Sequence, residues 1–204
     1  PLVSVLMTVF NREKYISEAI ESVLESTYTN FELIILDDNS HDSSVKIAKD
    51  YEKRDSRVKL FINDKNLGQF RNRNKAANLA KGKYLKYLDS DDLLYPHGLQ
   101  VMVWAIEQFP DAAFAISYPK PEDKNPYPIY LQPESAYKEQ FLGTGVMDAG
   151  PSAIIFNRKD FLNARGFNES SYVGNDTEVL YRMARRKPIV KMPTSLVWWR
   201  RHEG

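Results

Sequence analysis

The chain has 204 residues, of which 43% are hydrophobic and 27% charged, and its formal net charge is +1. These values suit one globular domain with a full core, and the near-zero charge gives no support for a nucleic-acid-binding protein. The absence of cysteine excludes disulfides and thiolate metal sites. The same absence favours the cytoplasm, so we expect a cytoplasmic protein. No apolar run reaches the roughly 18 residues of a transmembrane helix, and peripheral association at the inner face of a membrane is left open.

Strand and helix patterns alternate along the first 117 residues. Short β-prone apolar runs predict strands at 2–10, 31–37, 58–62, 84–88 and 112–117. Apolar residues at helical spacing predict helices near 15–25, 45–51, 69–80 and 96–109. This alternation is typical of an α/β fold with a mostly parallel central sheet flanked by helices. Ligands of such sheets bind at the carboxyl ends of the strands.

The pattern becomes less regular after residue 117. Five prolines between 119 and 133 predict an irregular loop, and glycines predict another at 143–151. Further strands are expected at 152–157, 189–192 and 196–199, and further helices at 158–164 and 176–186. We therefore expect a single domain, 1–204, with a regular half at 1–117 and a smaller mixed half at 118–204.

Three carboxylates follow the strand at 84–88. Asp89, Asp91 and Asp92 occur within four residues, and such like charges repel one another unless a cation or several donors compensate. Mg²⁺ or Mn²⁺ suits this arrangement because a hard divalent ion prefers carboxylate oxygens. The alternative is that these residues cap a helix that begins near Pro96.

Other polar residues lie at predicted strand ends and helix starts. Asp38 fits either an Asx-turn or an acceptor for the N–H of a base, and Arg73 either a solvated helix face or a contact to a base or phosphate. The chain contains neither G-x-G-x-x-G nor G-x-x-x-x-G-K-[ST], which argues against a dinucleotide-binding domain and a P-loop NTPase.

The second half carries two further candidate groups. Asp176 and Glu178 begin a predicted helix, where they fit either capping or the role of a general base towards a hydroxyl nucleophile. The run Trp198-Trp-Arg-Arg-His202 fits either an interface anchor or a site for diphosphate and metal.

Six short segments of the chain, taken in order, resemble the motifs of glycosyltransferase family 2. This family contains the inverting nucleotide-sugar enzymes with the GT-A fold. The segments are Thr-Val-Phe-Asn-Arg at 8–12, Asp-Asp-Asn-Ser at 37–40, Asn66-x-Gly68 with Arg73-Asn74, Asp89-Ser-Asp-Asp with Pro96, Gly-Asn-Asp at 174–176, and Arg201-His202. The chain departs from the family pattern at three positions: Phe10 replaces a tyrosine, Asn39 a glycine and Asn175 a glutamate.

The resemblance implies a role for each matching residue. Asp176 would be the general base that deprotonates the acceptor hydroxyl, and Asp92 would cap the following helix. The residues implied at the nucleotide are Thr8, Phe10, Asn11, Asp38, Arg73 and Asp89. The residues implied at a Mn²⁺ or Mg²⁺ ion are Asp91, Asp89 and His202, with Arg200 and Arg201 at the diphosphate. The implied reaction moves a sugar, most simply from a UDP-sugar, to a glycan or lipid-linked acceptor in polysaccharide or cell-surface glycan synthesis.

Two alternatives remain open at this stage. A nucleotidyltransferase could use the same sheet and metal, although its usual glycine-rich basic loop is replaced here by Asn11-Arg-Glu-Lys14. A non-catalytic sugar- or nucleotide-binding domain of the same fold would explain Asn175. The acceptor is expected over 119–150, where the resemblance is thinnest.

Overall fold

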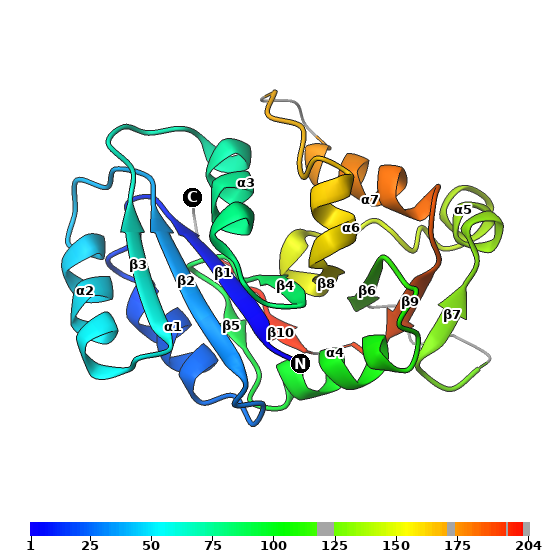
Figure 1. Ribbon diagram of the computed structural model, residues 1–204, viewed down its shortest axis with the longest axis horizontal. Helices are drawn as coiled ribbons and strands as arrows, with labels where there is room; N and C mark the ends of the chain where they lie inside the picture. Colours follow the sequence, from blue (N-terminus) through cyan, green and yellow to red (C-terminus); the bar gives the residue numbers. More distant parts are fainter. Residues whose placement is uncertain (118–124, 171–173, 195, 202–204) are drawn as a thin grey trace.

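The computed structural model describes residues 1–117, 125–170, 174–194 and 196–201. An eight-stranded mixed, mostly parallel sheet has the strand order β3-β2-β1-β4-β8-β6-β9-β7, and helices cover both of its faces (Figure 1). The predicted α/β architecture is therefore confirmed. The strands are β1 Val3–Val9, β2 Phe31–Asp37, β3 Val58–Ile62, β4 Tyr84–Tyr87, β5 Leu93–Leu94, β6 Phe114–Ser117, β7 Ile129–Leu131, β8 Ile154–Asn157, β9 Ile189–Met192 and β10 Val197–Trp198. The helices are α1 Ile16–Leu24, α2 Ser44–Arg54, α3 Gln69–Leu79, α4 Gly98–Glu107, α5 Pro133–Leu142, α6 Arg158–Asn163 and α7 Asn175–Ala184, with a 3₁₀ turn η1 at Pro151–Ala153.

The two faces of the sheet bury two separate cores. Alternate residues of a strand point to opposite faces, so Val5 and Met7 of β1 join one core while Leu6 joins the other. The first core packs under α1, α2 and α4, and the second under α3, α5, α6 and α7. Strands buried on both faces read as continuous apolar runs, which explains why they are recognisable in the sequence.

β1 to β4 form the regular part of the sheet. β1 pairs in parallel with β2 and β4, and β2 pairs in parallel with β3. Their carboxyl ends therefore meet at one edge of the sheet. This edge receives the segments that follow Val9, Asp37 and Tyr87, and these segments carry the predicted nucleotide and metal residues.

The fifth strand of the predicted parallel series lies elsewhere. β6 does not pair with β4, because β8 is inserted antiparallel between them. β6 instead pairs in parallel with β9, whose other neighbour β7 is antiparallel. This insertion carries η1, at the start of β8, to the carboxyl end of β4. Local periodicity does not report such long-range strand order.

Several elements were not expected, among them β7 and α5. The predicted irregular loop is wrong at its end, where Ile129–Leu131 forms β7 and Pro133 begins α5. Proline suits the first turn of a helix, because an N–H there has no partner within the helix. Residues 119–124 of the predicted loop lie outside the described part of the chain.

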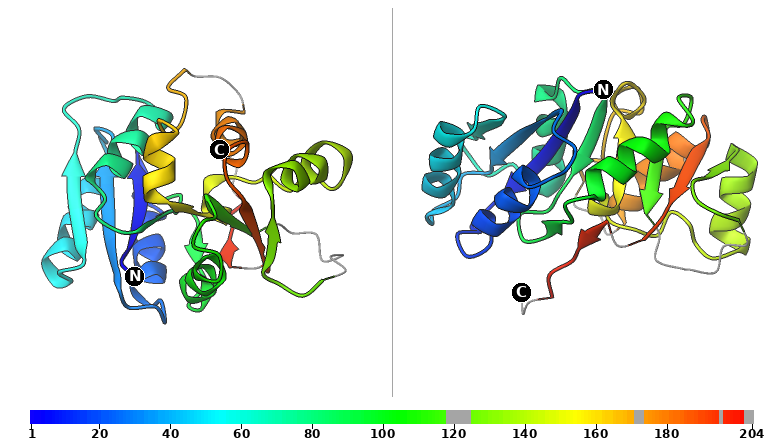
Figure 2. Two further views of the ribbon diagram at one scale, coloured as in Figure 1. Left: turned by 45° about the vertical axis from the view of Figure 1, so that its right-hand side comes forward. Right: turned by 90° about the horizontal axis from the view of Figure 1, so that it is seen from below.

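A two-stranded antiparallel sheet follows Asp89-Ser90-Asp91, which we call the D-x-D segment. β5 pairs with β10, and Figure 2 shows β10 apart from the eight-stranded sheet. The segment around β10 is thereby held beside residues 89–92, although about a hundred residues separate the two in the chain. Within the described ranges, no helix has both the length and the apolar character needed to cross a membrane.

Candidate active site

A cleft of about 530 Å³ opens at the carboxyl ends of β1, β2 and β4; we call it the strand-end cleft. Its wall includes six of the residues predicted to bind nucleotide or metal: Thr8, Phe10, Asp38, Arg73, Asp89 and Asp91. Asn66, Gly68, Gln69 and Asn72, on and before α3, complete one side. The fold thus brings most of the predicted residues to one cleft.

Phe10 and Asn11 differ in what they offer a ligand. The Phe10 ring is 41% exposed at the cleft, where it can stack on a planar group. Asn11 does not line the cleft. Its side-chain oxygen accepts a hydrogen bond from the His41 amide at 2.9 Å, and its φ of +53° makes the sharp turn after β1. Asn11 therefore shapes the cleft rather than facing it.

Asp38 holds the loop that leads into α3. Its carboxylate is buried and accepts hydrogen bonds from Asn63 Nδ2 at 2.7 Å, from the Leu67 amide at 2.8 Å and from the Gly68 amide at 2.9 Å. Gly68 has a φ of +82°, which favours glycine at this turn. The contacts fix Asp38 firmly, so the cleft wall at this point is pre-organised.

Arg73 joins the two halves of the molecule. Its side chain is only 2% exposed, and its guanidinium donates to Asp89 Oδ1 at 2.7 Å and to Asp176 Oδ1 at 2.8 Å. Burial opposes the charge of Arg73, but attraction to Asp89 and Asp176 outweighs it and raises the pKa of the guanidinium. The predicted general base and the first D-x-D carboxylate therefore meet on one buried cation.

Asp176 lies at the first turn of α7 and its side chain is 35% exposed. Burial raises its pKa above the ordinary aspartate value, against the lowering effect of Arg73, and the Asp89 charge raises it further. It caps nothing, because the N-cap residue is Gly174 with a φ of +95°. A partly exposed carboxylate with a raised pKa suits a general base.

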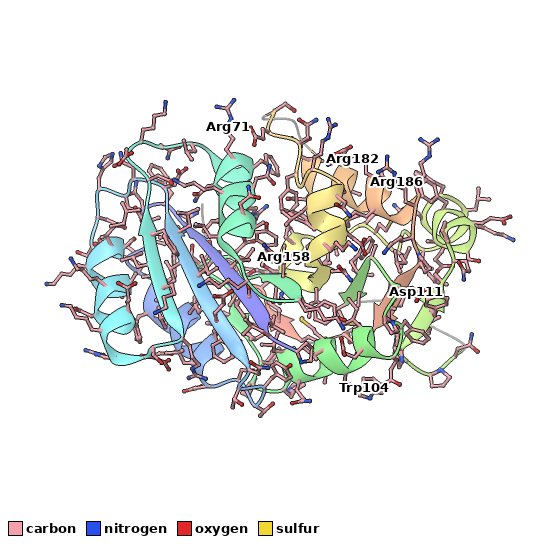
Figure 3. The ribbon with its side chains drawn as sticks, in the orientation of Figure 1. Arg71, Trp104, Asp111, Arg158, Arg182 and Arg186 are labelled. Carbon is pink, nitrogen blue, oxygen red and sulfur yellow. The ribbon has the colours of Figure 1, made fainter. Side chains whose placement is uncertain are left out.

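The neighbours of Asp176 have structural contacts. Glu178 Oε1 pairs with Arg182 Nε at 2.6 Å, and Arg182, labelled on α7 in Figure 3, also donates to the Gly166 carbonyl. Asn175 is buried, and its amide donates to the backbone carbonyls of Asn168 and Ser170. A glutamate could accept but not donate there, so Asn175 fits its own surroundings.

Asp91 faces a different arginine. Its Oδ2 lies 3.3 Å from Arg12 Nε, and both side chains line the strand-end cleft.

Asp92 does not cap α4, contrary to our expectation. The helix begins at Gly98, two residues after Pro96, and β5 lies between Asp92 and the helix. Asp92 Oδ1 instead accepts from the Arg200 amide at 3.1 Å, and burial raises its pKa to about 6.

A buried lysine lies beneath the three aspartates. Lys86 of β4 is fully buried, and its Nζ donates to the carbonyls of Tyr87 and Ser152. Ser152 Oγ in turn accepts from the Asp89 amide at 3.2 Å. Burial lowers the pKa of Lys86 to about 7, although the charges of Asp89 and Asp92 act in the opposite direction. Lys86 and Ser152 thereby fasten η1 to the D-x-D turn.

The predicted diphosphate residues lie outside the strand-end cleft. Arg200 Nε donates to the Asp91 carbonyl at 2.9 Å, and its guanidinium pairs with Glu18 and lies over the Tyr15 and Trp198 rings. Arg201 lines a second cavity of about 470 Å³ together with Trp198 and Trp199. His202, predicted as a metal ligand, lies outside the described residues.

The chemistry of the cleft fits a divalent ion that is shared with a substrate. No group of three or more His, Cys, Asp or Glu side chains that could hold a metal occurs among the described residues. Asp89 and Asp91 offer two carboxylates at an open cleft. Mg²⁺ is commonly bound in this way, by one or two carboxylates together with substrate phosphates.

Two residues with direct contacts to the site were not singled out from the sequence: Lys86 and Ser152. Lys86 carried a signal, since a lysine inside the apolar run Tyr-Leu-Lys-Tyr-Leu at 84–88 is unusual for a buried strand. Arg12 belongs to the matching segment at 8–12, but the sequence did not indicate its partner Asp91. Nothing in the chain order places Ser152 beside Asp89.

Curated relatives of this chain are named as glycosyltransferases. The chain is 43% identical over 102 residues to an uncharacterized glycosyltransferase of Methanocaldococcus jannaschii, a match covering 49% of this chain and 35% of that protein. It is 41% identical over 92 residues to TuaG of Bacillus subtilis, whose name places it in teichuronic acid biosynthesis, covering 45% of this chain and 36% of TuaG. The chain thus spans about a third of the length of these relatives.

Solved structures share the fold. The crystal structure of S. aureus TarS residues 1–349 in complex with UDP-GlcNAc has a TM-score of 0.81 at 19% identity, covering 100% of this chain and 60% of that one. The mannosyltransferase PcManGT from Pyrobaculum calidifontis, in complex with GDP-Man and Mn²⁺, has a TM-score of 0.73 at 16% identity. The match covers 94% of this chain and 54% of that one. The family model for glycosyl transferase family 2 matches residues 4–163. The chain therefore belongs to glycosyl transferase family 2.

Proposed function

We propose that this chain is a metal-dependent inverting glycosyltransferase that moves a sugar from a UDP-sugar to an acceptor hydroxyl. The observation that carries the proposal is Arg73, which holds Asp89 and Asp176 within hydrogen-bond distance although they come from opposite halves of the chain. A general base must lie close to the donor site, and this contact joins the two. The complex of TarS with UDP-GlcNAc supports the choice of a UDP-sugar.

Asp176 acts as the base in this proposal. It accepts the proton of the acceptor hydroxyl, whose oxygen attacks the anomeric carbon from the face opposite the diphosphate. One displacement inverts the configuration and needs no covalent intermediate, in contrast to a retaining hydrolase with two flanking carboxylates. Phe10 stacks on the uracil ring of the donor nucleotide, and Arg73 keeps Asp176 oriented.

A divalent ion completes the donor site. Asp91 and Asp89 would hold Mn²⁺ or Mg²⁺, with the Mn²⁺ in the PcManGT complex as support. When bound, the ion neutralises charge that develops on the leaving diphosphate. The name of TuaG supports an acceptor in polysaccharide or cell-surface glycan synthesis, such as a glycan or a lipid-linked sugar. The setting is cytoplasmic, at or near the inner membrane face.

Binding and transfer test the proposal separately. UDP-, GDP- and dTDP-sugars are screened with Mn²⁺ by thermal shift, and a UDP-sugar is expected to raise the melting temperature most. Asp91→Ala should remove the metal-dependent part of that shift. If no nucleotide diphosphate shifts the wild-type protein, the transferase proposal fails.

Asp176→Asn tests the base. We expect it to keep UDP binding and to lose about 10²–10⁴-fold in transfer rate, the range for removing a general base. Normal transfer by Asp176→Asn would show that another group is the base. Identification of the product also separates the alternatives, because a nucleotidyltransferase would release pyrophosphate and a binding domain would release no UDP.

A further inference from the structure

Each carboxylate of the D-x-D segment that lines the strand-end cleft faces an arginine, but the two pairs differ. Arg73 is 2% exposed and reaches two carboxylates, so its position is fixed by burial. Arg12 is 41% exposed, and it lies 3.3 Å from Asp91 through Nε. An ion pair between partly exposed groups contributes little net stability and can be exchanged for another partner.

The backbone of Arg12 is held more firmly than its guanidinium. Its amide donates to the buried Ser44 hydroxyl at 2.8 Å, which ties the turn after β1 to the start of α2. Its Nη1 donates to the Phe10 carbonyl at 3.4 Å and to the Asn11 carbonyl at 3.2 Å, at and beyond the long end of the usual hydrogen-bond range. The side chain can therefore change partners within the cleft without moving the strand.

The same two groups have complementary ligands in the proposed reaction. A guanidinium 3.3 Å from Asp91 Oδ2 opposes the approach of a divalent cation to that carboxylate. The planar guanidinium is also well suited to bind phosphate oxygens. A nucleotide diphosphate that enters with its ion would offer each group a stronger partner.

We propose that Arg12 neutralises Asp91 in the donor-free protein and transfers to the donor diphosphate when Asp91 takes the metal ion. This inference rests on the proposed function, since it deepens the assignment of the same cleft. Its consequence is cooperativity: the ion binds weakly alone, and nucleotide and ion strengthen each other's binding. Such coupling is reciprocal, so it can be measured from either ligand.

Arg12→Gln tests this exchange by binding measurements alone. Titration calorimetry gives Mn²⁺ affinity with and without UDP, and UDP affinity with and without Mn²⁺. We expect Mn²⁺ to bind donor-free Arg12→Gln about fivefold more tightly than wild type, because the competing cation is gone. UDP with Mn²⁺ should bind about tenfold more weakly, since a charged hydrogen bond to phosphate is lost.

Two further variants control for charge and fold. Arg71→Gln makes the same change at an exposed arginine that pairs with Glu169 and points away from the molecule at the outer end of α3 (Figure 3). It should behave as wild type in every titration. Arg12→Lys keeps a cation in the cleft and should retain weak donor-free Mn²⁺ binding, so it remains informative if Arg12→Gln is unstable.

The outcomes distinguish this inference from the proposed function. If wild-type protein binds UDP and Mn²⁺ cooperatively but Arg12→Gln binds both as wild type does, the exchange is wrong and the proposed function stands. If Arg12→Gln weakens Mn²⁺ binding to the donor-free protein, Arg12 supports the metal site and the inference is also overturned. If wild-type protein binds neither ligand, the proposed function itself fails.

Discussion

The two halves of the molecule build the candidate active site in different ways. In residues 1–117, the carboxylates of the site follow the carboxyl ends of parallel strands, as Asp38 follows β2 and Asp89 follows β4, and Arg73 lies on the adjacent helix α3. In residues 125–201, the strands are mixed, and the relevant groups reach the cleft through contacts with α3 and the D-x-D turn. The first half places its residues by topology, whereas the second half places them by side-chain contacts.

Two adjacent residues of α3 connect the first half of the molecule to the second by hydrogen bonds. Arg73 pairs with Asp176, and Asn74 exchanges two hydrogen bonds of 2.9 Å with the backbone of Phe167. Both contacts span more than ninety residues of sequence. The position of Asp176 therefore depends on α3 as much as on its own helix, and this dependence can be tested by mutation.

The largest effect is expected from Arg73→Met, which removes the ion pairs that connect α3 to Asp89 and Asp176. It leaves Asp89 and Asp176 without their shared cation, and it should lower transfer by at least about a hundredfold through misplacement of both groups. The free energy of unfolding should fall by about 2–3 kcal/mol, less than for a fully buried pair because both carboxylates are one-third exposed. Kinetics and urea denaturation measure the two effects. Unchanged transfer would show that the halves are placed independently.

A smaller effect is expected from Asn175→Glu, which introduces the residue of the family pattern. Glutamate cannot donate to the Asn168 and Ser170 carbonyls, so the loop before α7 should lose about 1–3 kcal/mol of stability. Asn175→Gln keeps a donor and should lose less. Denaturant midpoints measure the difference, and a more stable glutamate variant would contradict the structural role of Asn175.

Lys86→Met tests how β4 is fastened to η1. The pKa of Lys86 is lowered to about 7 in the folded state, so between pH 7 and 10 the unfolded chain binds more protons. Stability of the wild type should therefore rise with pH across this window, by up to about 1.4 kcal/mol per pH unit, and this slope should disappear in Lys86→Met. Melting temperatures at several pH values measure the slope. Lys49→Met, at an exposed lysine of α2, should keep it.

The smallest effect is expected from Glu178→Gln. Glu178 pairs with Arg182 on α7 and does not contact Arg73, so transfer should change by less than about threefold. Its comparison with Asp176→Asn shows which carboxylate of this helix is the base. A loss of transfer in Glu178→Gln comparable to that in Asp176→Asn would reverse the assignment.

The sequence by itself determined the α/β class, the first four strands and the family. Strands buried on both faces and helices with one apolar face leave periodic patterns that can be recognised locally, and the motifs at 8–12, 37–40 and 89–96 follow those strands directly. The expected convergence of Thr8, Phe10, Asp38, Asp89 and Asp91 in one cleft follows from parallel topology alone.

Only the tertiary structure decided the strand order beyond β4 and the partners of the charged residues. β8 lies between β4 and β6, so Ser152 reaches Asp89, and a buried arginine links Asp89 to Asp176. These contacts join residues far apart in the chain, and their energies depend on burial and distance that no local pattern encodes. The same reason explains why Asp92 binds the Arg200 amide instead of capping α4.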